Sequence, residues 1–326
     1  MWVCATCGLA QLLEDPTVPE EPKGVEPQAL ILQAAAAVSR VEAAGLLPAD
    51  GTVVEYGSPH GGSWLGILAD RGMVPVSGAA RADLIVDCFG MMHAGDQAAA
   101  LDERTARLAP GGTLLLQYHS LETIVRHRQW NALRHGHYAY YSTTALLAML
   151  SAVGFHARTA WTFDLYGGTV LLAARRDADE PGSADEAIDA LLAAEERARI
   201  TDPRTLAGLQ DAARDQARAL RDWLKTARAT GQAVLGYGAA SRAVALLHIA
   251  EVDSDLLPAV TDASPAKQGS RMPGTSIPVI SPDELIARCP DAVLLFVPDL
   301  LAEVRASYPH IEAAGGRWVR VDAHVG

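Results

Sequence analysis

VVEYGSPHGGSW, residues 53–64, contains the pattern that decides the fold. Apolar residues suited to a buried strand run into a glycine turn, and residues suited to a helix follow. VLGYGAASRAVALL (234–247) repeats this order two-thirds of the way along the chain. Backbone amides at the start of such a helix attract anions and ribose hydroxyls, so each turn is a candidate nucleotide site. The alternative for each is a tight turn that needs glycine for its backbone conformation alone.

Strand and helix patterns alternate outward from both turns. After 53–57 the sequence predicts a helix at SWLGILADRG, a short strand at MVPVSG, a strand at ADLIVDCFG, a helix at AGDQAAALDERTARLA and a strand at GTLLLQYH. A helix at TTALLAMLSAVG and a hairpin at ARTAWTFDLYGGTVLLAAR follow. This alternation is typical of a doubly wound parallel sheet, here with an antiparallel end. A second, smaller α/β unit begins near Gln232.

Composition shifts divide the chain into four parts. Residues 1–28 hold a Cys-x-x-Cys knuckle and a Pro- and Glu-rich linker, and 29–176 hold the first α/β domain. The acidic run DADEPGSADE marks a boundary, after which 177–229 are predicted as a helical linker. The second α/β domain takes 230–326. We therefore expect two separate sheets.

The composition restricts the class of function. A chain of 326 residues with 49% hydrophobic and 20% charged residues suits a soluble globular protein. Its formal net charge of −12 argues against non-specific binding to nucleic acid or to an anionic membrane. No apolar run reaches the ~18 residues that span a bilayer, and MWVCATCGLAQ lacks the features of a signal peptide. With only four cysteines, we expect a cytoplasmic protein that acts on a small molecule, in an oligomeric state left open.

The second glycine turn carries a specific resemblance. An NAD site would need an acidic residue ~20 positions on, and Asp262 fits, but an exposed Gly/Pro loop follows it in place of a helix. GYGAASRAVALL…TDASPAKQGSRMPGTSIPVISPDEL resembles the C-terminal domain of sugar-nucleotide C-methyltransferases, which add a branch methyl to a dTDP-linked keto-sugar in deoxysugar and antibiotic biosynthesis. The matching positions are 236–239, Asp262, 267–269 and 273–275.

The resemblance covers nearly the whole chain, from Cys4 to 315–319. It implies a class I methyltransferase-like sheet, which usually closes with antiparallel strands, and a smaller half-Rossmann-like α/β domain at the C-terminus. It also implies that the second turn is not a NAD site and that S-adenosylmethionine binds at the first turn. The cofactor-binding candidates are Glu55, Gly57, Ser58, Gly61 and Asp87.

Several positions depart from the family pattern. The family holds zinc with four cysteines, whereas only Cys4 and Cys7 stand here, so we expect no metal; a zinc site shared between two chains is the alternative. The strand MVPVSG lacks the acid that grips the ribose, and neither Asp83 nor Asp87 stands at its place. A helix and a strand that usually flank the adenine are missing, and Gln117 replaces an acid at the end of its strand.

The catalytic segment, RHGHYAYYS (134–142), is altered too. His137 falls on the family's general base, whereas Gly136 replaces a glutamate and Arg134 replaces a tyrosine. His135 and Arg134 are the candidates for stabilising an enolate. Four histidines, at 119, 127, 135 and 137, raise the alternative of a metal, but their irregular spacing favours loop histidines beside an anionic sugar nucleotide.

The favoured hypothesis is an enzyme, a C-methyltransferase of a keto-sugar nucleotide or related ketone. His137 would remove a proton next to the carbonyl, a task that suits an imidazole, and the enolate would attack the methyl of S-adenosylmethionine. The alternative is a protein of the same fold that no longer uses this donor, either an epimerase or tautomerase or a non-catalytic homologue that binds sugar nucleotides. We expect a cleft between the domains. The substrate-binding candidates are Tyr140, Tyr141, Tyr166, Arg242, Lys267 and Arg271.

Overall fold

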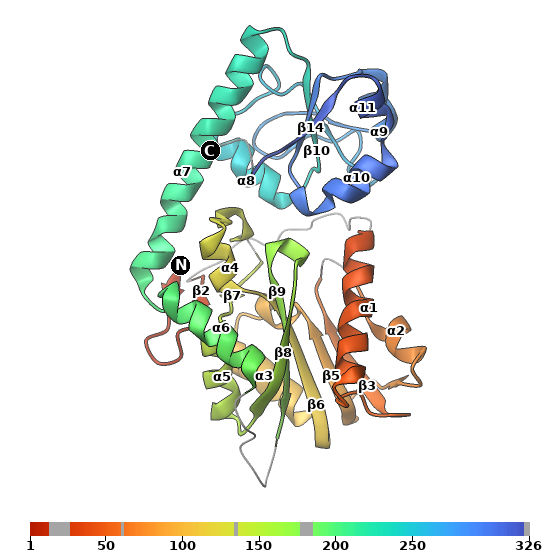
Figure 1. Cartoon of the computed structure of the whole chain (residues 1–326), viewed down its shortest axis with the longest axis vertical. Helices are drawn as coiled ribbons and strands as arrows, with labels where there is room; N and C mark the ends of the chain where they lie inside the picture. Colours follow the sequence, from red (N-terminus) through yellow and green to blue (C-terminus); the bar gives the residue numbers. More distant parts are fainter. Residues whose placement is uncertain (13–26, 60–61, 134–135, 177–184, 323–326) are drawn as a thin grey trace. The chain divides into compact units, whose positions relative to one another are not determined.

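The structure, a computed structural model, describes residues 1–12, 27–59, 62–133, 136–176 and 185–322 (Figure 1). These residues form two compact units. The first contains most of the described chain up to Leu206, and the second contains the chain from Ala207 together with 128–133. Each unit has its own sheet, as the two glycine turns predicted.

The sheet of the first unit has six strands in the order β4-β3-β5-β6-β9-β8. The first four of these are parallel, and β9 inserts antiparallel between β6 and β8. This arrangement confirms the predicted class I methyltransferase-like sheet. The strand bounds are β3 Thr52–Gly57, β4 Val74–Pro75, β5 Ala82–Cys88, β6 Leu108–His119, β8 His156–Phe163 and β9 Thr169–Arg175.

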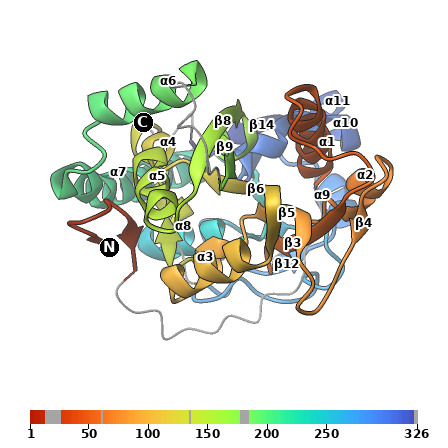
Figure 2. The same cartoon turned by 90° about the horizontal axis from the view of Figure 1, so that it is seen from below.

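Helices cover both faces of this sheet, because successive residues of each strand face opposite sides. Val53 and Leu84 pack toward α1 (Gln28–Ala43) and α2 (Leu65–Ala69). Val54 and Ile85 pack toward α3 (Gln97–Ala106), α5 (Thr143–Ala152) and α6 (Glu186–Arg197). Figure 2 shows α1 and α2 on one side of the sheet and α3 and α5 on the other. Shorter elements complete the unit: η1 Met91–His93, α4 Leu121–Arg126 and η3 Leu165–Gly167.

One edge of the sheet is shortened, as the sequence predicted. The fully described stretch 76–81 leads directly from β4 to β5 and contains neither a helix nor a strand. The two-residue strand β4 therefore forms the edge, where Val74 is 57% exposed.

The two cysteines of the halved knuckle lie in a hairpin. Strands β1 (Trp2–Val3) and β2 (Ala10–Gln11) pair with each other, and β2 also pairs with β7 (Ala139–Tyr140). The Cys4 amide donates to the Leu9 carbonyl, and the Gly8 amide donates to the Cys4 carbonyl. Both thiols are free; hydrogen bonds from the Cys7 and Thr6 amides lower the pKa of Cys4, whereas burial raises the pKa of Cys7.

The second unit is built on a five-stranded parallel sheet in the order β12-β11-β10-β13-β14. Its strands are β10 Val234–Tyr237, β11 Val260–Thr261, β12 Val279–Ile280, β13 Ala292–Leu295 and β14 Arg317–Arg320. Its helical elements are η2 Trp130–Ala132, α7 Pro203–Ala229, which begins in the first unit, α8 Ser241–Ile249, α9 Pro282–Ala287, η4 Pro298–Leu300, α10 Leu301–Ser307 and α11 His310–Ala313. None of the helices in the described part of the chain has the length and apolarity to cross a membrane.

A buried carboxylate fixes the start of α5. The first amides of a helix have no partner inside the helix and need one elsewhere. Ser142 caps α5 by accepting from the Ala145 amide. Glu195 of α6, which is 2% exposed, accepts from the Thr143 amide at 2.5 Å, the Thr144 amide at 2.9 Å and the Thr144 hydroxyl at 2.6 Å. Negative charge at a helix N-terminus is favourable, so Glu195 joins α6 to α5.

We predict that Glu195→Ala lowers the free energy of unfolding by about 3 kcal/mol, because it leaves buried amides without an acceptor. Glu196→Ala is the matched control, since Glu196 is exposed on the same helix, and it should change stability by less than about 0.5 kcal/mol. Urea unfolding of both variants measures the difference. Equal effects of the two substitutions would show that Glu195 does not fix the helix.

Candidate functional site

The acid that precedes the first glycine turn, Glu55, bonds to residues on its far side. Glu55 accepts a hydrogen bond from the Ser63 hydroxyl at 2.6 Å and another from the Trp64 amide at 2.5 Å. These bonds tie the end of β3 to the residues that start α2. Gly57 is exposed, and the nearest atom to a Cβ added there is the Gly62 carbonyl oxygen at 3.6 Å. Among the described residues, a Cβ at Gly57 would therefore meet only ordinary van der Waals contact.

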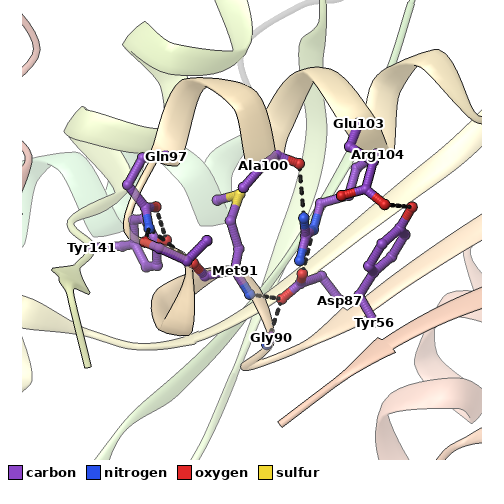
Figure 3. Close-up of polar contacts among 10 residues, drawn as sticks. Tyr56, Asp87, Gly90, Met91, Gln97, Ala100, Glu103, Arg104 and Tyr141 are labelled. Carbon is purple, nitrogen blue, oxygen red and sulfur yellow. Dashed lines mark hydrogen bonds and ion pairs between the residues drawn. The ribbon is translucent and has the colours of Figure 1, made fainter. Parts of the chain in front are cut away.

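Asp87, a predicted cofactor-binding residue, is buried and paired within the first unit. The side chain is 2% exposed and forms a 2.5 Å ion pair with Arg104 of α3, which is also buried (Figure 3). Its other oxygen accepts from the Gly90 and Met91 amides. Burial raises the pKa of Asp87, and the Arg104 guanidinium opposes this rise. The Arg104 guanidinium also lies 4.2 Å from the centre of the Tyr56 ring.

The inward face of α3 is polar at both ends. Gln97 and Arg104 are seven residues apart, which places them on the same side of a helix. Gln97 donates to the carbonyls of Met91 at 2.9 Å and Ala94 at 2.6 Å, and it accepts from the Tyr141 hydroxyl. Figure 3 shows Gln97 and Arg104 reaching toward the turn after β5 from the two ends of this helix. Asp87 and Gln97 together bond two amides and two carbonyls of residues 90–94.

The turn 90–94 carries His93, which the sequence analysis missed. Its Nδ1 lies 2.7 Å from the Gly136 carbonyl oxygen, and its Nε2 lies 3.4 Å from the Ser58 hydroxyl. A carbonyl only accepts, so Nδ1 carries the proton, and in the neutral ring Nε2 is the acceptor that faces Ser58. The ring packs edge-on against His137, with 4.7 Å between ring centres. His93 thus brings together the first glycine turn and the predicted base.

A positional signal could have identified His93. It follows a predicted strand, and side chains at the carboxyl ends of parallel strands gather at one edge of the sheet. The four histidines that the sequence singled out, at 119, 127, 135 and 137, lie close together in the chain instead. Among the described residues, no three His, Cys, Asp or Glu side chains gather as metal ligands would.

The predicted site residues around His137 are more buried than expected. His137 is 7% exposed, although it was predicted as a polar loop residue, and its ring centre lies 6.3 Å from that of Tyr140. Tyr140 is 2% exposed. Tyr141, another predicted substrate contact, is 3% exposed, and its hydroxyl is bonded to Gln97. The hydrophobic core of the first unit surrounds it.

Tyr166, the third predicted tyrosine, is half-buried in a different aromatic group. It has a positive φ of 55° in η3, after which β9 begins. Its ring centre lies 5.9 Å from that of Phe89 and 6.2 Å from that of His119. Phe89 and His119 follow or end neighbouring strands, so Tyr166 stays a candidate substrate contact at the same sheet edge. Arg134, His135 and Gly61 lie outside the described residues.

In the second unit, the glycine turn is hydrogen-bonded to Asp262, which follows the neighbouring strand β11. Asp262 accepts from the Ala239 amide at 2.9 Å and from the Ser264 amide at 2.8 Å. A Cβ at Gly238 would lie 2.9 Å from the Val297 side chain, so the turn also packs closely against β13's end. The acid that a NAD ribose would need is thus engaged within the loop.

The three predicted basic residues of this unit have partners within it. Lys267 donates to the Ala239 carbonyl at 2.9 Å and lies 3.4 Å from the Asp262 carboxylate. Arg242 lies 3.9 Å from the Asp299 carboxylate. The Arg271 guanidinium donates to the Ser276 carbonyl at 2.6 Å and is exposed. A diphosphate would have to compete with these contacts.

Comparison with known families gives two matches. The model of the C-methyltransferase C-terminal domain matches residues 164–321, and a methyltransferase domain matches residues 73–160. The C-methyltransferase NovU of Streptomyces niveus is 27% identical over 239 residues, which are 71% of this chain and 54% of that protein. The chain therefore spans about half the length of this relative.

Solved methyltransferases resemble part of the chain. NodS, an N-methyltransferase from Bradyrhizobium japonicum in complex with S-adenosyl-L-homocysteine, is 16% identical with a TM-score of 0.34, covering 45% of this chain and 87% of its own. CcbJ of Streptomyces caelestis is 14% identical with a TM-score of 0.33, covering 49% of this chain and 100% of its own. At these scores the fold assignment rests on the strand order of the chain itself.

We predict that Arg104→Met lowers the free energy of unfolding by about 3 to 5 kcal/mol, because Asp87 then keeps a buried charge without a partner. The double variant Asp87→Asn/Arg104→Met should recover part of this loss, since the asparagine oxygen still accepts from the amides of the turn. Urea unfolding of the single and double variants checks both statements. A double variant less stable than Arg104→Met would contradict this account.

Proposed function

We propose that this chain, whose residues 164–321 match the C-methyltransferase C-terminal domain, transfers a methyl group to a carbon atom of a keto-sugar nucleotide in antibiotic biosynthesis. The observation that supports the proposal most is the meeting of His137, His93 and Ser58 beside the first glycine turn. The turn would hold the methyl donor, and His137 is the base that the chemistry needs. NovU of Streptomyces niveus, a relative of this chain, is a C-methyltransferase.

S-adenosylmethionine is the methyl donor in this proposal, and the first turn fits it. Glu55 holds the turn in place, and the space beside Gly57 lets a ligand approach the backbone. The fully described stretch 74–80 contains no carboxylate for the ribose diol, so the donor would be held mainly by the turn. The bound donor supplies an electrophilic methyl group.

His137 takes the proton from the carbon next to the substrate carbonyl. A ketone acidifies this carbon, and a positioned imidazole accelerates such a transfer by about 10² to 10⁴-fold. His93 lies edge-on to His137 and is fixed by its bonds to Gly136 and Ser58, so it orients the base relative to the donor site. The resulting enolate carbon would be the nucleophile for the methyl group that a bound donor would supply, with the demethylated donor as the leaving group. Tyr166 is the candidate contact for the sugar.

The alternative is a proton-transfer enzyme that does not use the donor. The shortened sheet edge and the missing ribose acid favour it, because both remove parts of the usual donor pocket. The same base would then remove a proton that solvent returns, giving epimerisation or tautomerisation of a keto-sugar. The proposed contacts for the diphosphate of a sugar nucleotide stay the three basic residues of the second unit, Lys267, Arg242 and Arg271.

We predict that Gly57→Ala weakens the binding of S-adenosylmethionine and its demethylated product by about tenfold or more. The alanine side chain would occupy space that the ligand needs, while the free protein accommodates it. Gly66→Ala is the control, since Gly66 lies on α2 and has open space around it. Calorimetric titration measures both affinities. If the wild-type protein binds neither ligand, the donor-independent alternative is favoured.

We predict that His137→Ala lowers turnover by about two to four orders of magnitude, because it removes the general base. The buried ring also contributes to packing, so the free energy of unfolding should fall by about 1 kcal/mol. His156→Ala is the control, because His156 is exposed on β8 and should leave both quantities unchanged.

The assay uses a keto-sugar nucleotide in deuterated water, with S-adenosylmethionine in one arm and without it in the other. Methyl transfer in the first arm supports methylation. Deuterium incorporation alone, in both arms, supports the proton-transfer alternative. Full turnover of His137→Ala would place the base elsewhere, with His135 as the next candidate.

A further inference from the structure

A buried polar contact in the first unit connects the two segments that carry the facing histidines. His93 lies on the turn after β5, and His137 precedes β7, so they come from positions 44 residues apart in the chain. Between these segments, the Tyr138 amide donates to the Met92 carbonyl at 2.8 Å. The Tyr141 hydroxyl donates to Gln97, which in turn donates to two carbonyls of the turn.

We propose that Tyr141 and Gln97 are positioning residues that set the distance between His93 and His137, and thereby hold the base in register with the donor turn. This inference rests on the proposed function. Tyr141 is 3% and Gln97 6% exposed, and their polar atoms bond to each other and to carbonyls of the turn. They act through the backbone of residues 91–94, which they fix from the side of α3.

The geometry explains why the contact matters for the site more than for the fold. Asp87 binds only the amides that begin the turn, at Gly90 and Met91. Gln97 binds two carbonyls of the turn, that of Met91, which comes before His93 in the chain, and that of Ala94, which comes after it. Gln97 has one oxygen, and Tyr141 supplies the donor for it. Without the Tyr141 hydroxyl, the Gln97 amide keeps its two donor bonds and loses the bond that holds its oxygen.

The chain offers a closely matched control. Tyr118 lies in the same hydrophobic core and packs edge-on against Tyr141, with 6.1 Å between ring centres. It is 2% exposed, and its hydroxyl is hydrogen-bonded to the Thr143 hydroxyl at 2.8 Å. Tyr141→Phe and Tyr118→Phe therefore each remove one buried hydroxyl with one partner. Only the first hydroxyl is connected to the turn that carries His93.

The test compares the two variants by three measurements: melting temperature, steady-state kinetics across pH, and the NMR signals of the histidine rings. The His93 and His137 signals are assigned with His93→Gln and His137→Gln. We expect both tyrosine variants to lose similar stability. Tyr141→Phe should lower kcat by about 10- to 100-fold, with KM for the donor nearly unchanged, and should shift the His93 and His137 signals and their titration. Tyr118→Phe should retain the wild-type kcat and signals.

Unchanged His93 and His137 signals in Tyr141→Phe would overturn the proposal, as would equal shifts in Tyr118→Phe. If the wild-type protein transfers no methyl group, the proposed function fails, but the NMR comparison still decides the positioning role. Should Tyr141→Phe not fold, Gln97→Glu makes the same comparison. It keeps an acceptor for the Tyr141 hydroxyl and removes the donors to Met91 and Ala94.

Discussion

Asp87 and Arg104 form a buried ion pair at the carboxyl edge of the first sheet, and the geometry of the candidate site depends on it. Moving two charges out of water is costly, so such a pair persists only where further hydrogen bonds satisfy both groups. Here Asp87 also accepts two amides of the following turn, while Arg104 donates to the Ala100 carbonyl and covers the Tyr56 ring. The pair therefore joins β5, α3 and the end of β3, the three elements that surround the turn carrying His93.

The two units use the same strand–glycine–helix pattern in opposite ways. In the first unit the acid before the glycine, Glu55, binds the far side of the turn and leaves Gly57 exposed. In the second, Asp262 comes from the neighbouring strand and binds the Ala239 amide directly, with Lys267 beside it. A ligand would meet an exposed glycine at the first turn, whereas at the second turn the Ala239 amide is already hydrogen-bonded to a side chain. The position of the acid, more than the glycine pattern, distinguishes the two turns.

Much of the fold could be predicted from the sequence, whereas the interior of the site could not. Strand and helix periods predicted both sheets and the antiparallel end, because these follow from local patterns, whereas the shortened edge was predicted from the family resemblance. Gln97 and Arg104 carry no such signal, since polar residues on an amphipathic helix normally face solvent. Tyr141 was predicted to contact substrate because it lies in the altered catalytic segment, yet its partner, Gln97, is 44 residues away in the chain. Pairings of this kind become visible only when the helix is placed on the sheet.

The shortened sheet has a consequence for self-association. An edge strand presents unpaired backbone groups to which a strand of another molecule can add, and this is a common route to aggregation. The amides of Val74 in β4 and of Val76 just after it donate inward, to the carbonyls of Gly51 just before β3 and of Val53 in β3, so the amide of the residue between them would face outward. That residue is Pro75, which has no N–H to offer. At this uncovered edge, a proline thus stands at the position where an incoming strand would need an N–H donor. The missing donor disfavours the addition of another strand, although the edge is exposed.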